Sequence, residues 1–197
     1  MKKKINNYDT FNSIQLFGLD NFFHDFVKLY ESNKLPKVLL LSGEKGLGKF
    51  TLVFHLVNYL LSNKNTESYN LDNFKINQQS HIYKQIVSNV CQNFVYISNE
   101  YKSKTSIENI RLLKKTFNNS LLNNMPRFIV FDDVELMNIN SANSLLKLIE
   151  EPNPNIYFFL IHNSKEKILD TLKSRCIKFN LFLNENYKTK VVDKLLN

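Results

Sequence analysis

The sequence predicts an α/β domain with a five-stranded parallel sheet sandwiched by helices. Three observations lead to this fold class. Short apolar runs typical of buried strands alternate with helical stretches. The loop Gly43–Thr51, "GEKGLGKFT", holds three of the four glycines and lies between the first such run and a helix. A later apolar run, "FIVFDD", ends in two carboxylates. Alternating strands and helices imply right-handed crossovers and a parallel sheet, whose ligands bind beyond the carboxyl ends of the strands.

The first half of the chain supplies two expected helices around the first strand. In residues 19–33 one helical face carries Phe22, Phe23, Phe26, Val27 and Tyr30, and Pro36 closes the following turn. Residues 38–41 are an apolar strand, and the glycine loop opens a helix over 49–61. The polar, asparagine-rich segment 63–80 is expected to be an exposed loop.

The second half continues the alternation of strands and helices. A strand over 93–98 precedes a helix over 101–122, which starts with a capping box of Thr105 and Glu108. The third strand is 127–133, and the helix over 141–152 ends at a proline. Strands are expected at 155–163 and 173–179, and a further helix starts within 184–197. We expect one folded domain with the start of a second.

Composition restricts the cellular setting. The 197 residues are 43% hydrophobic, which argues against disorder, and "MKKKINNYDTFN" turns polar where a signal peptide would turn apolar. No apolar run is long enough for a membrane span, so a cytoplasmic protein is expected. Two lone cysteines supply neither a disulfide framework nor a metal cluster. The net charge of +8 suits a nucleic acid or acidic protein partner, and equally a lysine-rich solvated surface.

The glycine loop has the spacing of a phosphate-binding loop. Its glycines let backbone N–H groups converge on phosphate oxygens at a helix N-terminus, and Lys49 can reach the outer phosphates. Phe50 stands where the motif has a serine or threonine whose hydroxyl ligates Mg²⁺, and Thr51 lies about 100° further round the helix. A plain glycine turn with a surface lysine is the alternative. The residues expected around a nucleotide are Gly43, Glu44, Lys45, Gly46, Leu47, Gly48, Lys49, Phe50 and Thr51.

The carboxylates that end the third strand would complete such a site. Asp132 is placed to hold Mg²⁺ through water, and Asp133 occupies the position that polarises the attacking water. Glutamate is usual at that second position, and aspartate is one methylene shorter. Since a misplacement of about 1 Å can cost on the order of 100-fold in rate, ATP and Mg²⁺ are candidate cofactors but hydrolysis is expected to be weak. A solvated turn is the alternative for this pair.

The chain resembles the clamp-loader subunits of bacterial DNA polymerase III. The resemblance is carried by "SANSLLKLIEEP" and "SRC", with "LFGLDNFFHDFVKLYESNKLPKVLLLSGEKGLGKFTL" and "YKSKTSIENIRLLKK" upstream in the same order. It implies an AAA+ P-loop domain over 1–180 and the beginning of a helical lid domain over 181–197. The impaired site favours the delta-prime type. The implied role is in DNA replication, and the implied partners are gamma/tau and delta subunits, the sliding clamp and primer-template DNA, with no membrane.

The resemblance also assigns roles to single residues. Arg175 of "SRC" would act as an arginine finger on the ATP of a neighbouring subunit, and a structural ion pair is the alternative. Asn163 matches the sensor position, within one residue, or is an ordinary strand-end asparagine. Arg111, Lys114 and Lys115 would face DNA, or simply water. Residues 62–80 lack the four cysteines of the zinc module that many relatives carry, so no zinc is expected.

Two other functions remain open from the sequence. One is a gamma/tau-type motor that hydrolyses ATP in its own site despite Phe50 and Asp133. The other is a small P-loop nucleotide kinase, which would suit the length. A kinase needs an arginine-bearing lid, however, and this chain has only Arg111, Arg127 and Arg175.

Overall fold

The computed structural model describes residues 11–62, 67–98 and 125–183. The chain divides into two compact units. Of the described residues, the first unit contains 11–34, 50–62 and 67–91 with Leu183, and the second contains 35–49, 92–98 and 125–182. Within this described part of the chain, no helix is both long and apolar enough to cross a membrane.

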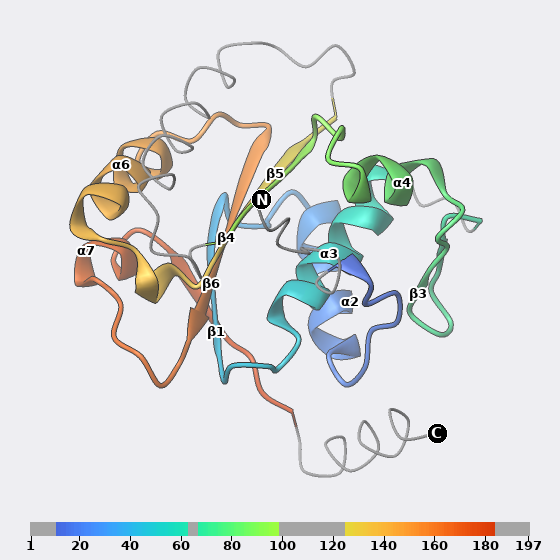
Figure 1. Ribbon diagram of the computed structural model, residues 1–197, viewed down its shortest axis with the longest axis horizontal. Helices are drawn as coiled ribbons and strands as arrows, with labels where there is room; N and C mark the ends of the chain where they lie inside the picture. Colours follow the sequence, from blue (N-terminus) through green and yellow to red (C-terminus); the bar gives the residue numbers. More distant parts are fainter. Residues whose placement is uncertain (1–10, 63–66, 99–124, 184–197) are drawn as a thin grey trace, which may run out of the picture. The chain divides into compact units, whose positions relative to one another are not determined.

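The second unit is built on the predicted five-stranded sheet. Its strands are β1 (Val38–Gly43), β4 (Phe94–Ser98), β5 (Arg127–Asp132), β6 (Ile156–Asn163) and β7 (Ile177–Asn180). Their order is β4-β5-β6-β1-β7, and every neighbouring pair is parallel. β1 is buried along its whole length, and its apolar run over 38–41 predicts a buried strand. Figure 1 shows these strands side by side, with α6 and α7 together on one side.

In the described part of the second unit, helices follow β5 and β6. A single 3-10 turn, η1 (Val134–Leu136), leads to α6 (Ile139–Ile149), and α7 (Asp170–Lys173) follows β6. The side chain of Asn138 caps α6 by accepting a hydrogen bond from the Ser141 N–H at 2.8 Å, so the helix begins two residues before the predicted start. A core cluster joins α6 to the sheet, and it includes Leu40, Phe131, Leu145, Ile149 and Phe158.

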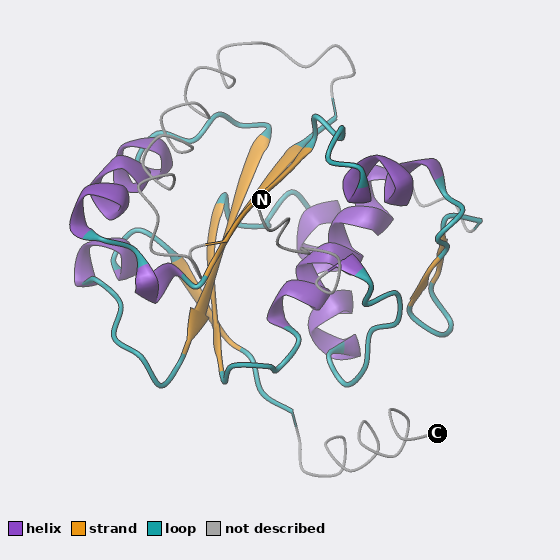
Figure 2. Cartoon of the chain, in the orientation of Figure 1, coloured by secondary structure: helices purple, strands orange, loops and turns teal. Residues whose placement is uncertain are grey.

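The described residues of the first unit form three helices and a small hairpin. Its elements are α2 (Asp20–Glu31), most of α3 (Lys49–Leu61), β2 (Tyr69–Asn70), β3 (Lys75–Ile76) and α4 (His81–Val87). Figure 2 shows the hairpin as the short orange pair. The expectation of an exposed loop over 63–80 was therefore wrong for the hairpin, because Tyr69 and Ile76 are each only 1% exposed. Tyr69 stacks on Phe23, and its hydroxyl hydrogen-bonds to His55.

The strand register brings the carboxyl ends of three neighbouring strands together. Gly43, at the end of β1, pairs with Asn163 at the end of β6. Asp132 ends β5, which lies on the other side of β6 from β1. It pairs with Ser98 at the end of β4. The glycine loop, the Asp pair and Asn163 therefore lie at one edge of the sheet, as the parallel arrangement predicts. The predicted helix over 101–122 and the residues from 184 onward lie outside the described residues.

Candidate nucleotide site

The glycine loop forms a tight turn between β1 and α3. Gly46 and Gly48 have φ values of 82° and 88°, in the left-handed region that favours glycine. The N–H of Leu47 donates to the carbonyl of Glu44 at 3.3 Å, which closes the turn. Lys45 also lies within this turn, and its positive charge contributes to lowering the pKa of Lys49. The loop therefore has the left-handed glycine conformations of a tight turn.

The Lys49 ammonium lies against its own loop. Its Nζ donates to the carbonyls of Gly43 at 2.9 Å and of Glu44 at 2.7 Å, and the residue is 6% exposed. Desolvation lowers the pKa of Lys49, while the negative charges of three carboxylates act in the opposite direction. These belong to Asp132, Glu135 and Asp133. The lysine predicted to reach phosphates is thus held within the loop and faces the acidic end of β5.

Asp132 lies at the end of β5 and bonds to two groups. One carboxylate oxygen accepts from the Tyr96 hydroxyl at 2.9 Å, and the other accepts from the backbone N–H of Asp133 at 2.9 Å. Burial raises the pKa of Asp132, and the neighbouring Asp133 charge raises it further. Burial and Asp132 in turn raise the pKa of the Tyr96 hydroxyl. Asp132 is therefore a partly buried carboxylate whose two oxygens are oriented by Tyr96 and by the Asp133 N–H.

Asp133 has an unusual backbone conformation. Its φ and ψ are 50° and 51°, in the left-handed region, at the point where β5 turns into η1. Aspartate and asparagine enter this region more readily than longer side chains because they hydrogen-bond locally. The aspartate that stands in place of the usual glutamate therefore suits the turn that carries it.

Glu135 is a third acidic residue at the site, and the sequence analysis did not identify it. Its Oε2 accepts a hydrogen bond from the backbone N–H of Asn163 at 3.2 Å. The negative charge of Glu135 raises the pKa of Lys49 more than the charge of Asp133 does. A sequence signal existed: Glu135 follows closely on the carboxyl end of a predicted strand, which is where ligands bind in a parallel sheet.

Asn163 lies in a turn that is tied to the glycine loop. The N–H of Ser164 donates to the Gly43 carbonyl at 3.0 Å, and the Asn163 amide oxygen accepts from the N–H of Lys165 at 3.3 Å. One residue earlier, the buried His162 pairs with Ser42 at 3.1 Å and donates through Nε2 to the Glu166 carbonyl at 3.0 Å. The end of β6 and the start of the glycine loop therefore form one hydrogen-bonded arrangement.

Phe50 and Thr51 lie in the first turn of α3, within the first unit. The Phe50 ring is 8% exposed and packs on two other rings of that unit. Its centroid lies 5.4 Å from that of Phe11 and 5.8 Å from that of Phe54. The position that would supply a hydroxyl to a metal is thus occupied by a side chain of an aromatic core.

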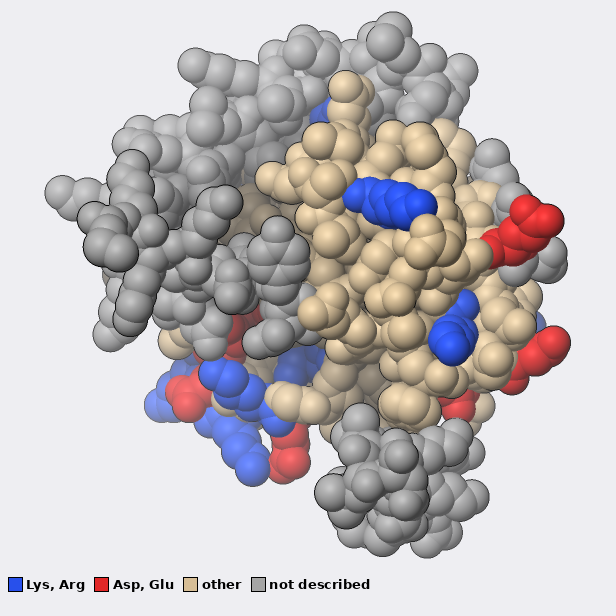
Figure 3. All heavy atoms as spheres, turned by 45° about the vertical axis from the view of Figure 1, so that its right-hand side comes forward, with Lys and Arg blue, Asp and Glu red and all other residues tan. Residues whose placement is uncertain are grey.

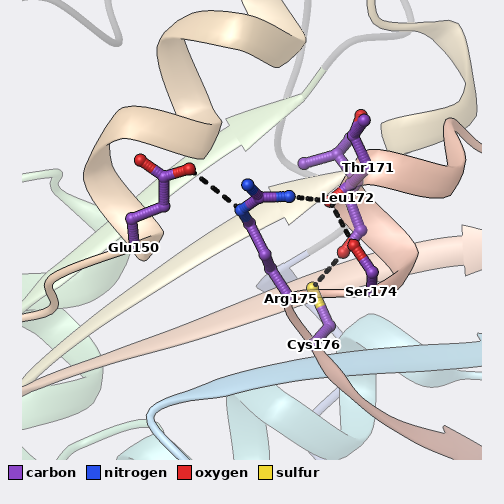
Figure 4. Close-up of polar contacts among 6 residues, drawn as sticks. All are labelled: Glu150, Thr171, Leu172, Ser174, Arg175 and Cys176. Carbon is purple, nitrogen blue, oxygen red and sulfur yellow. Dashed lines mark hydrogen bonds and ion pairs between the residues drawn. The ribbon is translucent and has the colours of Figure 1, made fainter.

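Arg175 follows α7 and is partly exposed. Its Nε donates to Oε1 of Glu150 at 2.9 Å, and its Nη1 donates to the carbonyl of Thr171 at 3.2 Å (Figure 4). The other two side chains of "SRC" also bond to carbonyls of α7, Ser174 Oγ to Thr171 at 3.1 Å and Cys176 Sγ to Leu172 at 3.0 Å. The motif therefore caps the C-terminal end of α7. The ion pair that was the alternative for Arg175 is present.

The remaining predicted contacts concern DNA and metal. Arg111, Lys114 and Lys115 lie outside the described residues. On the face drawn in Figure 3, basic and acidic side chains of described residues lie interleaved in the lower part. Lys165 and Glu44 form an ion pair at 3.1 Å. Among residues 11–62, 67–98 and 125–183, no group of three or more His, Cys, Asp or Glu side chains could hold a metal ion.

Comparison with known proteins shows relatives of two related kinds. A DNA polymerase III subunit delta' from Buchnera aphidicola subsp. Schizaphis graminum is 28% identical over 159 residues, which are 81% of this chain and 47% of the relative. A DNA polymerase III subunit gamma from the same organism is 28% identical over 152 residues, 77% of this chain and 40% of the relative. The chain thus spans less than half the length of these curated relatives.

The fold has a counterpart among solved structures. A DNA polymerase III gamma subunit-related protein from Thermotoga maritima matches with a TM-score of 0.59 at 18% identity, covering 89% of this chain and 49% of that one. This likeness confirms the predicted fold class. A family model described as "DNA polymerase III, delta subunit" matches residues 18–184. Since this match covers most of the chain, the protein belongs to the DNA polymerase III delta subunit family.

Proposed function

We propose that this chain is a delta-prime-type subunit of the DNA polymerase III clamp loader, which helps to place the sliding clamp on primed DNA. The observation that carries the proposal is the family match over residues 18–184, together with delta' and gamma subunits among the relatives. The partners are then gamma/tau and delta subunits, the clamp and primer-template DNA.

The site itself favours a subunit that hydrolyses little or no ATP. The glycine loop and Lys49 retain the groups that hold phosphates. Phe50 packs with Phe11 and Phe54 and offers no hydroxyl to Mg²⁺. In addition, Lys49 gives two of its three N–H donors to the carbonyls of Gly43 and Glu44, which leaves one for a phosphate. ATP can be held in such a site, while the metal lacks one of its usual ligands.

Arg175 is the residue that would serve catalysis, in the ATP site of a neighbouring subunit. Its side chain is 39% exposed, so a second subunit can reach it. Arginine suits this role because its charge is permanent and its planar fork contacts two phosphate oxygens at once. Such fingers contribute about 10³ to 10⁵ in rate to phosphoryl transfer.

A gamma/tau-type motor is the second candidate, and two observations favour it. A gamma subunit is among the relatives at the same 28% identity as the delta' subunit. Glu135 also adds a longer carboxylate beside Asp132 and Asp133, near Lys49. A motor subunit would hydrolyse ATP in its own site, whereas a delta-prime-type subunit would not.

The test is reconstitution of clamp loading. The full-length chain is mixed with gamma-type and delta subunits, clamp, primed DNA and ATP, and clamp transfer to DNA is followed with and without the chain. We expect the chain to enter the complex and to be required for loading, and to release little phosphate alone. Robust hydrolysis by the isolated chain would favour the motor. Phosphate transfer to a nucleotide acceptor, or failure to join the complex, would overturn the clamp-loader proposal.

A further inference from the structure

Arg175 lies between the C-terminal ends of two helices. Glu150 is the C-cap residue of α6, and Thr171 belongs to the last turn of α7. Arg175 bonds to both, through Nε to Glu150 and through Nη1 to the Thr171 carbonyl. Figure 4 shows the guanidinium between the two helix ends. The side chain therefore has a defined position before any partner contacts it.

The two contacts leave the outer part of the guanidinium available. An arginine has five N–H donors, one on Nε and two on each terminal nitrogen. Glu150 takes the Nε–H, and Thr171 takes one N–H of Nη1. These are the hydrogen bonds of Arg175 among the described residues, so the other Nη1–H and both Nη2–H groups remain as donors. This pair of nitrogens is the part of the fork that can bind two oxygens of a phosphate.

The position of Glu150 is not explained by helix stability. A negative charge at a helix C-terminus opposes the helix dipole, and two acidic residues, Glu150 and Glu151, stand at this end of α6. The Glu150 side chain is 47% exposed, and an exposed ion pair contributes little to folding. Its contact with Nε does, however, restrict a long side chain that otherwise has many rotamers.

We infer that Glu150 is a positioning residue for Arg175, which orders the guanidinium so that its terminal nitrogens are presented to the phosphate of a neighbouring nucleotide. The inference rests on the proposed role of Arg175. Ordering the side chain in advance lowers the conformational cost of engaging the phosphate in the transition state. The carboxylate binds the inner side of the guanidinium and does not occupy the part that would contact phosphate.

The test compares variants of the full chain in the complex with gamma-type and delta subunits, clamp and primed DNA. Phosphate release is measured as a function of ATP concentration for Glu150→Ala, Glu150→Gln, Glu151→Ala and Arg175→Ala. Glu150→Ala removes the acceptor of the Nε–H, and Glu150→Gln keeps an acceptor oxygen without the charge. Glu151→Ala is the matched control. It also removes an acidic side chain at this helix end, but Glu151 does not bond to Arg175.

We expect Glu150→Ala to lower kcat by about 2- to 12-fold, the scale expected when one long side chain loses its order, with KM for ATP unchanged. Glu150→Gln is expected to keep most of the rate, and Glu151→Ala all of it. The double variant Glu150→Ala with Arg175→Ala should be no slower than Arg175→Ala alone. A role confined to stability would lower the melting temperature and the amount of complex instead of kcat.

The outcomes separate the inference from the function on which it rests. If Arg175→Ala leaves the rate unchanged, the arginine finger is wrong and the positioning role is wrong with it. If Arg175→Ala lowers the rate but Glu150→Ala does not, the finger stands and the positioning role is overturned. A faster rate for Glu150→Ala would also overturn it, because Glu150 would then withhold the arginine.

Discussion

The backbone N–H of Asn163 donates to Oε2 of Glu135 at 3.2 Å, and this bond ties the end of β6 to the turn after β5. The two residues are 28 positions apart and lie at the same edge of the sheet as the glycine loop. Glu135 thereby fixes the backbone at Asn163, the residue that was predicted, within one residue, for the sensor position. It also adds negative charge near Lys49.

Removing the Glu135 carboxylate should loosen this edge of the sheet. Glu135→Ala leaves the N–H of Asn163 without its acceptor, and we expect a loss of about 1 kcal/mol in the free energy of unfolding. Glu135→Gln keeps an oxygen at the same place and should lose less than half of that. Urea unfolding of both variants checks the prediction. Equal losses for the two would mean that the hydrogen bond contributes nothing measurable.

The left-handed backbone of Asp133 should make Asp133→Glu destabilising. Asp133→Glu restores the residue usual in the family but places a longer side chain at φ 50°. We expect it to lose about 0.5–1 kcal/mol of stability and to give no ATP turnover in the isolated protein. Asp133→Asn, which tolerates this conformation, is the control and should unfold like the parent. Wild-type stability together with rapid hydrolysis in Asp133→Glu would contradict the role given to this turn.

His55 gives the first unit a dependence on pH. Its Nε2 donates to the Ser13 carbonyl at 2.9 Å, and in the neutral ring Nδ1 then accepts from the Tyr69 hydroxyl at 3.0 Å. Burial lowers the pKa of His55 from 6.5 to about 4. Between these pH values the unfolded chain binds a proton that the folded chain does not. Stability attributable to His55 therefore falls as pH falls from 6.5 to about 4, by up to about 3 kcal/mol, and is unaffected above that window.

Unfolding at pH 7 and pH 4.5 checks this dependence. His55→Gln should be less stable than the parent at pH 7, yet it should lose less stability on acidification. His81→Gln, at an exposed histidine, is the matched control and should follow the parent at both pH values. The same pH dependence in His55→Gln and the parent would show that His55 does not titrate as its burial implies.

The sheet could be predicted from the sequence because its strands are buried apolar runs. Residues 38–43, 127–132 and 156–163 each contain a short, mostly apolar run that is typical of a buried parallel strand. The β2–β3 hairpin could not, since its two strands are only two residues long and Tyr69 is buried by stacking on Phe23, which is distant in the sequence.

The chemistry of the site was only partly readable from the sequence. The loss of the hydroxyl at Phe50 follows from the motif, and the spacing of Phe50 and Phe54 indicates the aromatic packing that replaces it. The contact of Lys49 with its own loop has no sequence signature, because it depends on carbonyls that every residue carries. Similarly, the bond between Glu150 and Arg175 joins residues 25 positions apart through the meeting of two helix ends.

One comparison tests most directly whether this subunit's contribution to hydrolysis lies in Arg175 and not in its own site. The full chain is assembled with gamma-type and delta subunits, clamp and primed DNA, and phosphate release is measured for Arg175→Ala and for Lys49→Ala. We predict that Arg175→Ala lowers the rate at least several-fold, whereas Lys49→Ala leaves it nearly unchanged. A loss of rate in Lys49→Ala, with Arg175→Ala like the parent, would contradict the account.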